Sequence, residues 1–215
     1  MENRRVVVTG IGAVSPLGND AKSTWESMKA GRSGISLIES MDTSEYSVKI
    51  GGEVRGFDHT RYFSNPKDAR RMDRYAHLSI AAAQMALAES GLIEGEVDRD
   101  RIGVMLGSGI GGLGTLEANH TALLKRSPSR VSPFTIPMMI SNIASGVFSM
   151  EHGFGGPNMA IVTACATANH SIGEAWRMIK FGDADAFVAG GAEAAILPMG
   201  LAGFGNMRAL STRND

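Results

Sequence analysis

The residue with the clearest capacity for chemistry is Cys165, the only cysteine among 215 residues. It follows a short apolar run, residues 159–164, and precedes a segment with helical spacing, residues 166–181. A lone cysteine is more often a small buried hydrophobe than a reactive group. Directly before a helix, however, its thiolate is stabilised by unpaired N–H groups and by the positive end of the helix dipole. The position therefore favours a nucleophile.

The apolar residues of the expected helix indicate where Cys165 points. Spacing of i, i+3, i+4 and i+7 predicts that the packed face carries Ile172, Ala175, Trp176 and Ile179. At about 100° per residue, Cys165 falls within roughly 30° of the centre of this stripe. We therefore expect the thiol to point inward.

A thiolate also needs a group that moves protons, and the sequence offers none at a suitable spacing. His170 is the nearest histidine, but it lies about 140° round the helix from Cys165, so we expect it to be structural. The remaining histidines share no spacing that suggests a metal site: His59, His77, His120 and His152. The sequence thus shows a nucleophile without its base.

Strands and helices alternate around this cysteine. Short apolar or β-branched runs predict strands at 5–9, 101–106, 159–164 and 186–189. Helical spacing predicts helices at 19–29, 68–90, 113–125, 138–151 and 166–181. Residues 32–65 keep no period, and we expect loops with short strands there. The alternation indicates an α/β protein with a mainly parallel sheet.

Composition narrows the function. Hydrophobic residues make up 43% and charged residues 20%, which is typical of a globular protein. A formal net charge of -1 argues against a dedicated nucleic-acid binder. A single cysteine fits a reducing compartment, and no apolar run is long enough to cross a bilayer. Without a recognisable signal peptide, we expect a soluble cytoplasmic protein.

Seven stretches together resemble a known family. They are residues 8–12 (VTGIG), 15–18 (SPLG), 107–112 (GSGIGG), 162–175 (VTACATANHSIGEA), 182–185 (GDAD), 188–193 (VAGGAE) and 209–215 (ALSTRND). In this order they resemble the elongating β-ketoacyl-acyl-carrier-protein synthases, especially the type II form. That family has a thiolase-like fold, in which two similar α/β halves form a five-layered α-β-α-β-α sandwich. The resemblance implies that residues 1–215 are the N-terminal half, truncated before its last strand, with the C-terminal half absent.

The resemblance implies a 3-oxoacyl-ACP synthase of fatty-acid elongation. An acyl group would move from acyl carrier protein to Cys165, and the carbanion formed when malonyl-ACP loses CO2 would attack this thioester. The backbone N–H of Cys165 would be one oxyanion donor. Two histidines, a lysine and the second donor belong to the other half in this family, so this chain alone is expected to be inactive. No metal or organic cofactor is implied.

Other site residues also follow from the resemblance. Ile110 matches the position that gates the acyl pocket, and Phe204 matches a position near the active-site entrance. The family's basic patch for the carrier protein corresponds to Lys67, Arg70, Arg71, Arg130 and Arg208. Without the resemblance, these charges would indicate only solvated surface. A homodimer that pairs through residues 159–164 is implied as well.

Three alternatives remain open. The first is a polyketide-type ketosynthase, because these enzymes share much of the pattern. Here Ala166-Thr167 follows the cysteine, where several family members have Thr-Ser or Ser-Ser. A non-catalytic partner subunit, like the chain-length factors, would lack the cysteine. Residues 109–114 satisfy G-x-G-x-x-G, which suggests a nicotinamide-dependent dehydrogenase, but the acidic residue expected about 20 positions later is missing.

Overall fold

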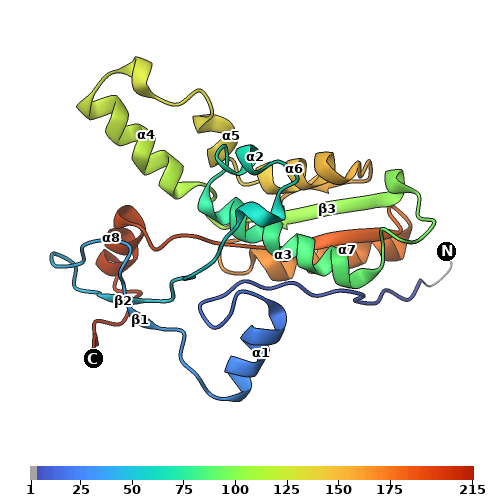
Figure 1. Cartoon of the computed structure of the whole chain (residues 1–215), viewed down its shortest axis with the longest axis horizontal. Helices are drawn as coiled ribbons and strands as arrows, with labels where there is room; N and C mark the ends of the chain where they lie inside the picture. The colour runs from blue at the N-terminus through green and yellow to red at the C-terminus, as the bar shows by residue number, and fades with distance from the viewer. Residues whose placement is uncertain (1–3) are drawn as a thin grey trace.

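A three-stranded parallel sheet with helices on both faces forms the centre of the computed structural model, which describes residues 4–215 (Figure 1). β3 (Ile102–Gly107) is the middle strand, flanked by β4 (Asn158–Met159) and β5 (Ala186–Gly191). Helix α7 (Thr167–Phe181) covers one face of the sheet, and α3 (Arg74–Ser90) and α6 (Ile143–His152) cover the other. The predicted α/β class with a parallel sheet is confirmed.

The core lies between the sheet and the pair α3 and α6. Alternate residues of β3 reach this side, namely Ile102, Val104 and Leu106, and they join the fully buried Tyr75 and Phe148. A buried hydroxyl links α6 to the sheet, because Ser145 Oγ accepts from the Leu106 amide at 2.7 Å and lies 2.9 Å from the Met159 carbonyl oxygen. Hydrogen bonds from α6 therefore hold the sheet edge that precedes Cys165.

Three predicted helices are confirmed: α1 (Ala21–Lys29), α4 (Leu113–Lys125) and α7. The helix predicted at 68–90 begins later than expected, because residues before it form a separate short helix, α2 (Pro66–Ala69). Asp73 caps the N-terminus of α3, and Gly91 ends it in the left-handed region with φ 66°.

The helix predicted at 138–151 is divided into α5 (Thr135–Met139) and α6. Between them Ile140 has an extended backbone, and its carbonyl oxygen accepts the hydroxyl of Tyr75. A tertiary contact thus interrupts the helical period. Sequence spacing also missed α8 (Pro198–Asn206), which lies at the C-terminal end of the molecule (Figure 1).

The short segments have the following bounds. Residues 32–65 contain β1 (Ser36–Leu37) and β2 (Ile50–Gly51), an antiparallel pair that confirms the loop-rich prediction. Single 3-10 turns are η1 (Thr60–Tyr62), η2 (Arg99–Arg101) and η3 (Pro128–Arg130). Across residues 4–215, no helix combines the length and apolar character that a membrane crossing requires.

Two strand predictions fail in whole or in part. Residues 5–9 form no strand; this segment runs beside α3, where a Cβ on Gly10 would lie 2.0 Å from the Ala86 carbonyl oxygen. β-Branched residues favour a strand only when a neighbouring strand offers hydrogen bonds, and this segment has no such partner among residues 4–215. The strand predicted at 159–164 is reduced to the two residues of β4, and an irregular turn follows.

Candidate active site

Cys165 lies on a turn between β4 and α7 and is exposed. The helix begins at Thr167, two residues after the cysteine, so the helical phase does not extend to the thiol. The predicted inward orientation is therefore wrong for this chain. The position directly before the N-terminal end of a helix is confirmed.

The packed face of α7 agrees with the prediction at Ala175 and differs from it elsewhere. Its buried residues are Thr167, Ser171 and Ala175, which follow i, i+4 and i+8 spacing. Ile172 and Trp176 are 51% and 46% exposed. Small side chains face the sheet because the helix approaches two glycine-ended strands closely, and larger side chains would not fit there.

The turn before the cysteine is strained. Ala164 has φ 51°, in the left-handed region, which costs a non-glycine residue about 1–2 kcal/mol. The turn closes through two backbone hydrogen bonds, from the Ala166 amide to Thr163 and from the Thr167 amide to Ala164, each 3.1 Å. Strain of this kind is common where a side chain must be held in an unusual place.

Three glycines in or near β3 and β5 make room for this turn and the start of α7: Gly107, Gly109 and Gly191. A Cβ on Gly107 would lie 2.5 Å from the methyl group of Thr167, which is closer than real Cβ contacts. A Cβ on Gly109 would lie 3.1 Å from the Ala164 carbonyl oxygen. The glycine cluster after β3 and the cysteine turn are therefore in contact, although about 55 residues separate them in sequence.

The backbone N–H of Cys165 has no hydrogen-bond acceptor among residues 4–215. It lies beside the N-terminal end of α7, where helix amides and the helix dipole favour negative charge. A free amide next to a nucleophile can donate to an oxyanion that develops on a bound thioester. This part of the chain can therefore provide a nucleophile and one oxyanion donor.

No histidine supplies a base for Cys165 in the described part of the chain. His170 is exposed, and its Nδ1 lies 2.8 Å from Thr163 Oγ1, which agrees with the prediction that it does not pair with Cys165. His59 and His77 stack on each other at 3.9 Å, and His152 bonds to Gln84. Residues 4–215 contain no cluster of three or more His, Cys, Asp or Glu side chains that could hold a metal ion.

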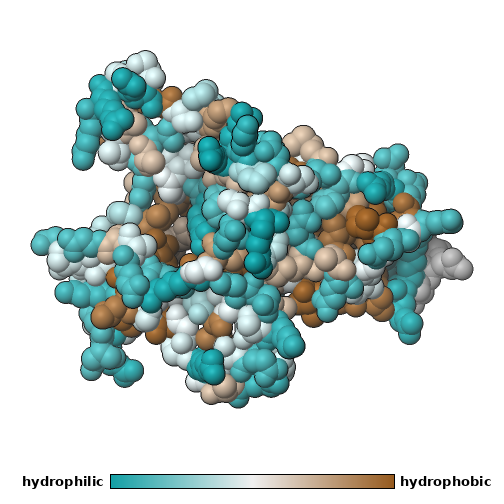
Figure 2. Space-filling view, viewed as in Figure 1, coloured by the Kyte–Doolittle hydropathy of each residue, from teal (hydrophilic) through white to brown (hydrophobic). Residues whose placement is uncertain are grey.

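Ile110 lines an apolar cleft next to the glycine cluster. The cleft has a volume of about 370 Å³ and is lined by Ile110, Gly112, Leu113, Leu116, Met139, Ile140 and Ser141. Figure 2 shows apolar surface in the hollow between α4 and the end of the molecule that carries α8. Because even a Cβ on Gly109 would come within 3.1 Å of the Ala164 carbonyl oxygen, the loop that carries Ile110 lies close to the cysteine turn.

Ser108 and Glu193 hold the loop that carries Ile110, a role that sequence reasoning did not assign. The Ser108 hydroxyl donates to Glu193 Oε1 at 2.9 Å and accepts the Gly111 amide at 3.0 Å. Both residues stand in stretches that carry the family resemblance: Ser108 directly follows β3, and Glu193 is the second residue after β5. Since the carboxyl ends of parallel strands share one edge of a sheet, their pairing was predictable from the strand assignment.

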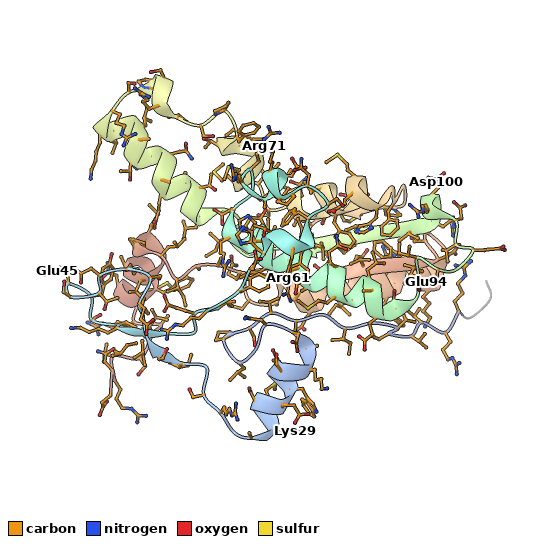
Figure 3. All side chains as sticks on the ribbon, in the orientation of Figure 1. Lys29, Glu45, Arg61, Arg71, Glu94 and Asp100 are labelled. Carbon is orange, nitrogen blue, oxygen red and sulfur yellow. The ribbon has the colours of Figure 1, made fainter. Side chains whose placement is uncertain are left out.

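Phe204 lies on α8 and is 38% exposed. The five basic residues are exposed and form no ion pair within residues 4–215. Lys67 and Arg70 belong to α2 and its C-cap. Arg71 lies beside α2 and α5 (Figure 3), with its guanidinium 4.8 Å from the ring centre of Phe134.

The G-x-G-x-x-G loop does not present a free cradle of amides for a pyrophosphate. The Gly111 amide donates to Ser108, the Gly112 amide to the Met139 carbonyl, and the Leu113 amide to Gly111. A dinucleotide site needs these amides directed at the ligand. The loop instead packs against α5, which argues against the dehydrogenase alternative.

An exposed thiol on a strand-to-helix turn, beside a free amide and an apolar cleft, is an arrangement suited to covalent acyl transfer. The model of the family described as "Beta-ketoacyl synthase, N-terminal domain" matches residues 3–215. The chain therefore belongs to the β-ketoacyl synthase family, and the predicted thiolase-like fold is confirmed.

Relatives with curated descriptions include 3-oxoacyl-[acyl-carrier-protein] synthase 2 of Vibrio cholerae, 53% identical over the whole chain, and that of Synechocystis, 47% identical. The chain covers 52% and 51% of these two proteins, so it spans about half the length of the curated relatives it matches.

Solved structures agree in fold. A β-ketoacyl synthase from Burkholderia phymatum aligns over 99% of this chain and 52% of its own, with a TM-score of 0.84 and 29% identity. A type II polyketide ketosynthase in complex with its acyl carrier protein aligns over 99% of this chain and 51% of its own, with a TM-score of 0.85 and 26% identity.

Proposed function

We propose that this chain is the nucleophile-bearing half of a 3-oxoacyl-ACP synthase that elongates fatty acids. The observation that carries the proposal is the position of Cys165, exposed before α7 with its own amide free. Family membership and the curated relatives of 47–53% identity support it.

The chemistry proceeds in two stages. The Cys165 thiolate attacks the thioester carbonyl of acyl-ACP, and a C–S bond to the cysteine forms while the C–S bond to the carrier breaks. The carrier sulfur leaves as a thiol with the proton that Cys165 has given up. Malonyl-ACP then loses CO2, and the resulting carbanion attacks the Cys165 thioester. The new C–C bond gives 3-oxoacyl-ACP and returns the thiolate. In both stages the Cys165 amide donates to the carbonyl oxygen as negative charge develops on it.

The base and the second oxyanion donor are proposed to come from a C-terminal half. Residues 4–215 place no histidine ring in hydrogen-bond contact with the thiol. The relatives, which are about twice as long as this chain, have room for such a half. Alone, this chain is expected to make no 3-oxoacyl product.

The substrates follow from the surfaces around the turn. The apolar cleft at Ile110 is proposed to hold the acyl chain, because its lining is almost wholly aliphatic. Phe204 is proposed to lie near the entrance. The carrier patch is proposed to comprise Lys67, Arg70, Arg71, Arg130 and Arg208. Their exposed charges have no acidic partners among the described residues, which leaves them available to an acidic carrier protein.

Assembly and location are proposed from the same resemblance. The exposed residues of β4 and the exposed Val162 suit pairing of this edge across a homodimer in the cytoplasm. A fatty-acid role is favoured over a polyketide role, because identity to the curated fatty-acid synthases is 47–53% and identity to the polyketide structure is 26%.

The test is an intact-mass measurement on the complete protein before and after incubation with acyl-ACP. An acyl-sized gain that disappears in Cys165→Ala would support the proposal. No gain in a protein that contains both halves would overturn it and favour a non-catalytic partner subunit.

A further inference from the structure

Every hydrogen-bonding group of Thr163, two residues before the nucleophile, is tied to the start of α7. Its amide donates to Thr167 Oγ1 at 2.9 Å, and its carbonyl oxygen accepts the Ala166 amide at 3.1 Å. Its hydroxyl lies 2.8 Å from Nδ1 of His170. Thr163 is thus fixed to three different residues of the segment that follows it.

These bonds act on the strained part of the turn. Ala164, with φ 51°, lies between Thr163 and Cys165. A strained backbone persists only where its surroundings determine it strongly, because it would otherwise relax to an unstrained conformation. Thr167 is buried and holds the amide side, whereas His170 is exposed and holds the hydroxyl side from one helical turn away.

We propose that His170 and Thr163 are positioning residues for the nucleophile. Their hydrogen bond holds the turn at Ala164, so the Cys165 thiol stays beside the N-terminal end of α7. His170 acts through Thr163 and does not exchange a proton with the thiol. For acyl transfer, this inference rests on the proposed function.

A merely structural role for the pair would have a different signature. His170 is exposed, so loss of its hydrogen bond should shift the midpoint of thermal unfolding by only a few degrees. A nucleophile displaced by about 1 Å, in contrast, can react about a hundredfold more slowly. Reactivity and stability therefore separate the two explanations.

The experiment compares Thr163→Val, His170→Ala and the double variant in the complete protein. Thr163→Ser keeps the hydroxyl, and His170→Asn keeps a polar atom close to the place of Nδ1. His120→Ala removes an exposed histidine of α4 and is the matched control. The rate of Cys165 alkylation by iodoacetamide is followed by peptide mass, and acyl loading is measured over a range of acyl-ACP concentrations.

We expect Thr163→Val and His170→Ala to slow alkylation and maximal acyl loading by about tenfold, with the half-saturating acyl-ACP concentration unchanged. The double variant should be no slower than either single variant, because both remove one hydrogen bond. Thr163→Ser, His170→Asn and His120→Ala should stay within about twofold of the unaltered protein.

The inference would be overturned by any of three results. The double variant could show additive effects, the rates of His170→Ala could be unaltered, or His170→Asn could be as slow as His170→Ala. If Thr163→Val does not fold, as judged by thermal unfolding, the comparison of His170→Ala with His170→Asn decides alone. Iodoacetamide needs no carrier protein. Slower alkylation in the variants, with no acyl loading even in the unaltered protein, would therefore overturn the proposed function and support the positioning role.

Discussion

One carboxylate joins the starts of two helices: Asp73 Oδ2 accepts both the amide and the hydroxyl of Thr115, at 2.8 and 2.7 Å. Asp73 is buried and also caps α3, through Oδ1 and the Tyr75 amide. Thr115 lies in the first turn of α4, the helix that lines the apolar cleft. The contact therefore connects the core helix α3 to the wall of the proposed acyl site.

Asp73→Ala should lower the free energy of unfolding by about 2–3 kcal/mol, because a cap and two buried hydrogen bonds are lost together. Asp20 caps α1 in the same way but is exposed and bonds no second helix, so Asp20→Ala should cost only about 1 kcal/mol. Urea denaturation of both variants measures the difference. Equal losses would show that the contact between helices contributes nothing.

Gly107→Ala should destabilise the chain by about 1–3 kcal/mol, since the added methyl group would lie 2.4 Å from the Ile161 carbonyl oxygen. Gly146→Ala is the control, because a Cβ at this position on α6 meets nothing within 4 Å. That change should stabilise the helix by about 0.5–1 kcal/mol. Denaturation curves that show the same sign for both substitutions would contradict the close approach of β3 and α7.

The free energy of unfolding should decrease at acidic pH because of His77. Burial lowers the pKa of this histidine from 6.5 to about 4, with the charge of Arg74 and the stacked His59 acting in the same direction. Below pH 6.5 His77 therefore becomes protonated in the unfolded chain, whereas in the folded chain it stays neutral until about pH 4. The contribution of neutral His77 to the free energy of unfolding is complete above pH 6.5. As the pH falls to 4, the free energy of unfolding should decrease by up to about 3 kcal/mol.

The variant His77→Phe tests this assignment by urea denaturation at several pH values. The slope of stability against pH between 4 and 6.5 should become smaller, whereas His120→Phe on exposed α4 should leave it unchanged. A slope that His77→Phe does not alter would assign the acid sensitivity to other groups.

Ile110→Phe should narrow the apolar cleft and shift the proposed enzyme toward shorter acyl groups. Loading of a hexadecanoyl group onto Cys165 should slow by about tenfold or more relative to an octanoyl group. Ile136→Phe alters a residue of α5 that is 61% exposed and outside the cleft lining, so it should leave the preference unchanged. Equal slowing of both acyl groups by Ile110→Phe would place the acyl chain elsewhere.

Sequence patterns alone were sufficient to predict the helices and strands that are determined by neighbouring residues. The period of 113–125 predicted α4 with its observed ends, and the apolar run 101–106 differs from β3 by one residue at each end. The same reasoning placed Cys165 directly before a helix and found no base for it. Residue types and spacing decide these features, because capping, glycine termination and apolar runs act over a few neighbouring residues.

Only the tertiary structure decided how the nucleophile is presented. The positive φ of Ala164 and the exposure of Cys165 depend on hydrogen bonds from α7 and on glycines about 55 residues earlier. The break at Ile140 needs the hydroxyl of Tyr75, 65 residues away. Residues 5–9 have strand composition but no neighbouring strand among residues 4–215. Each outcome rests on groups that are distant in sequence and meet only after folding, which a local pattern does not encode.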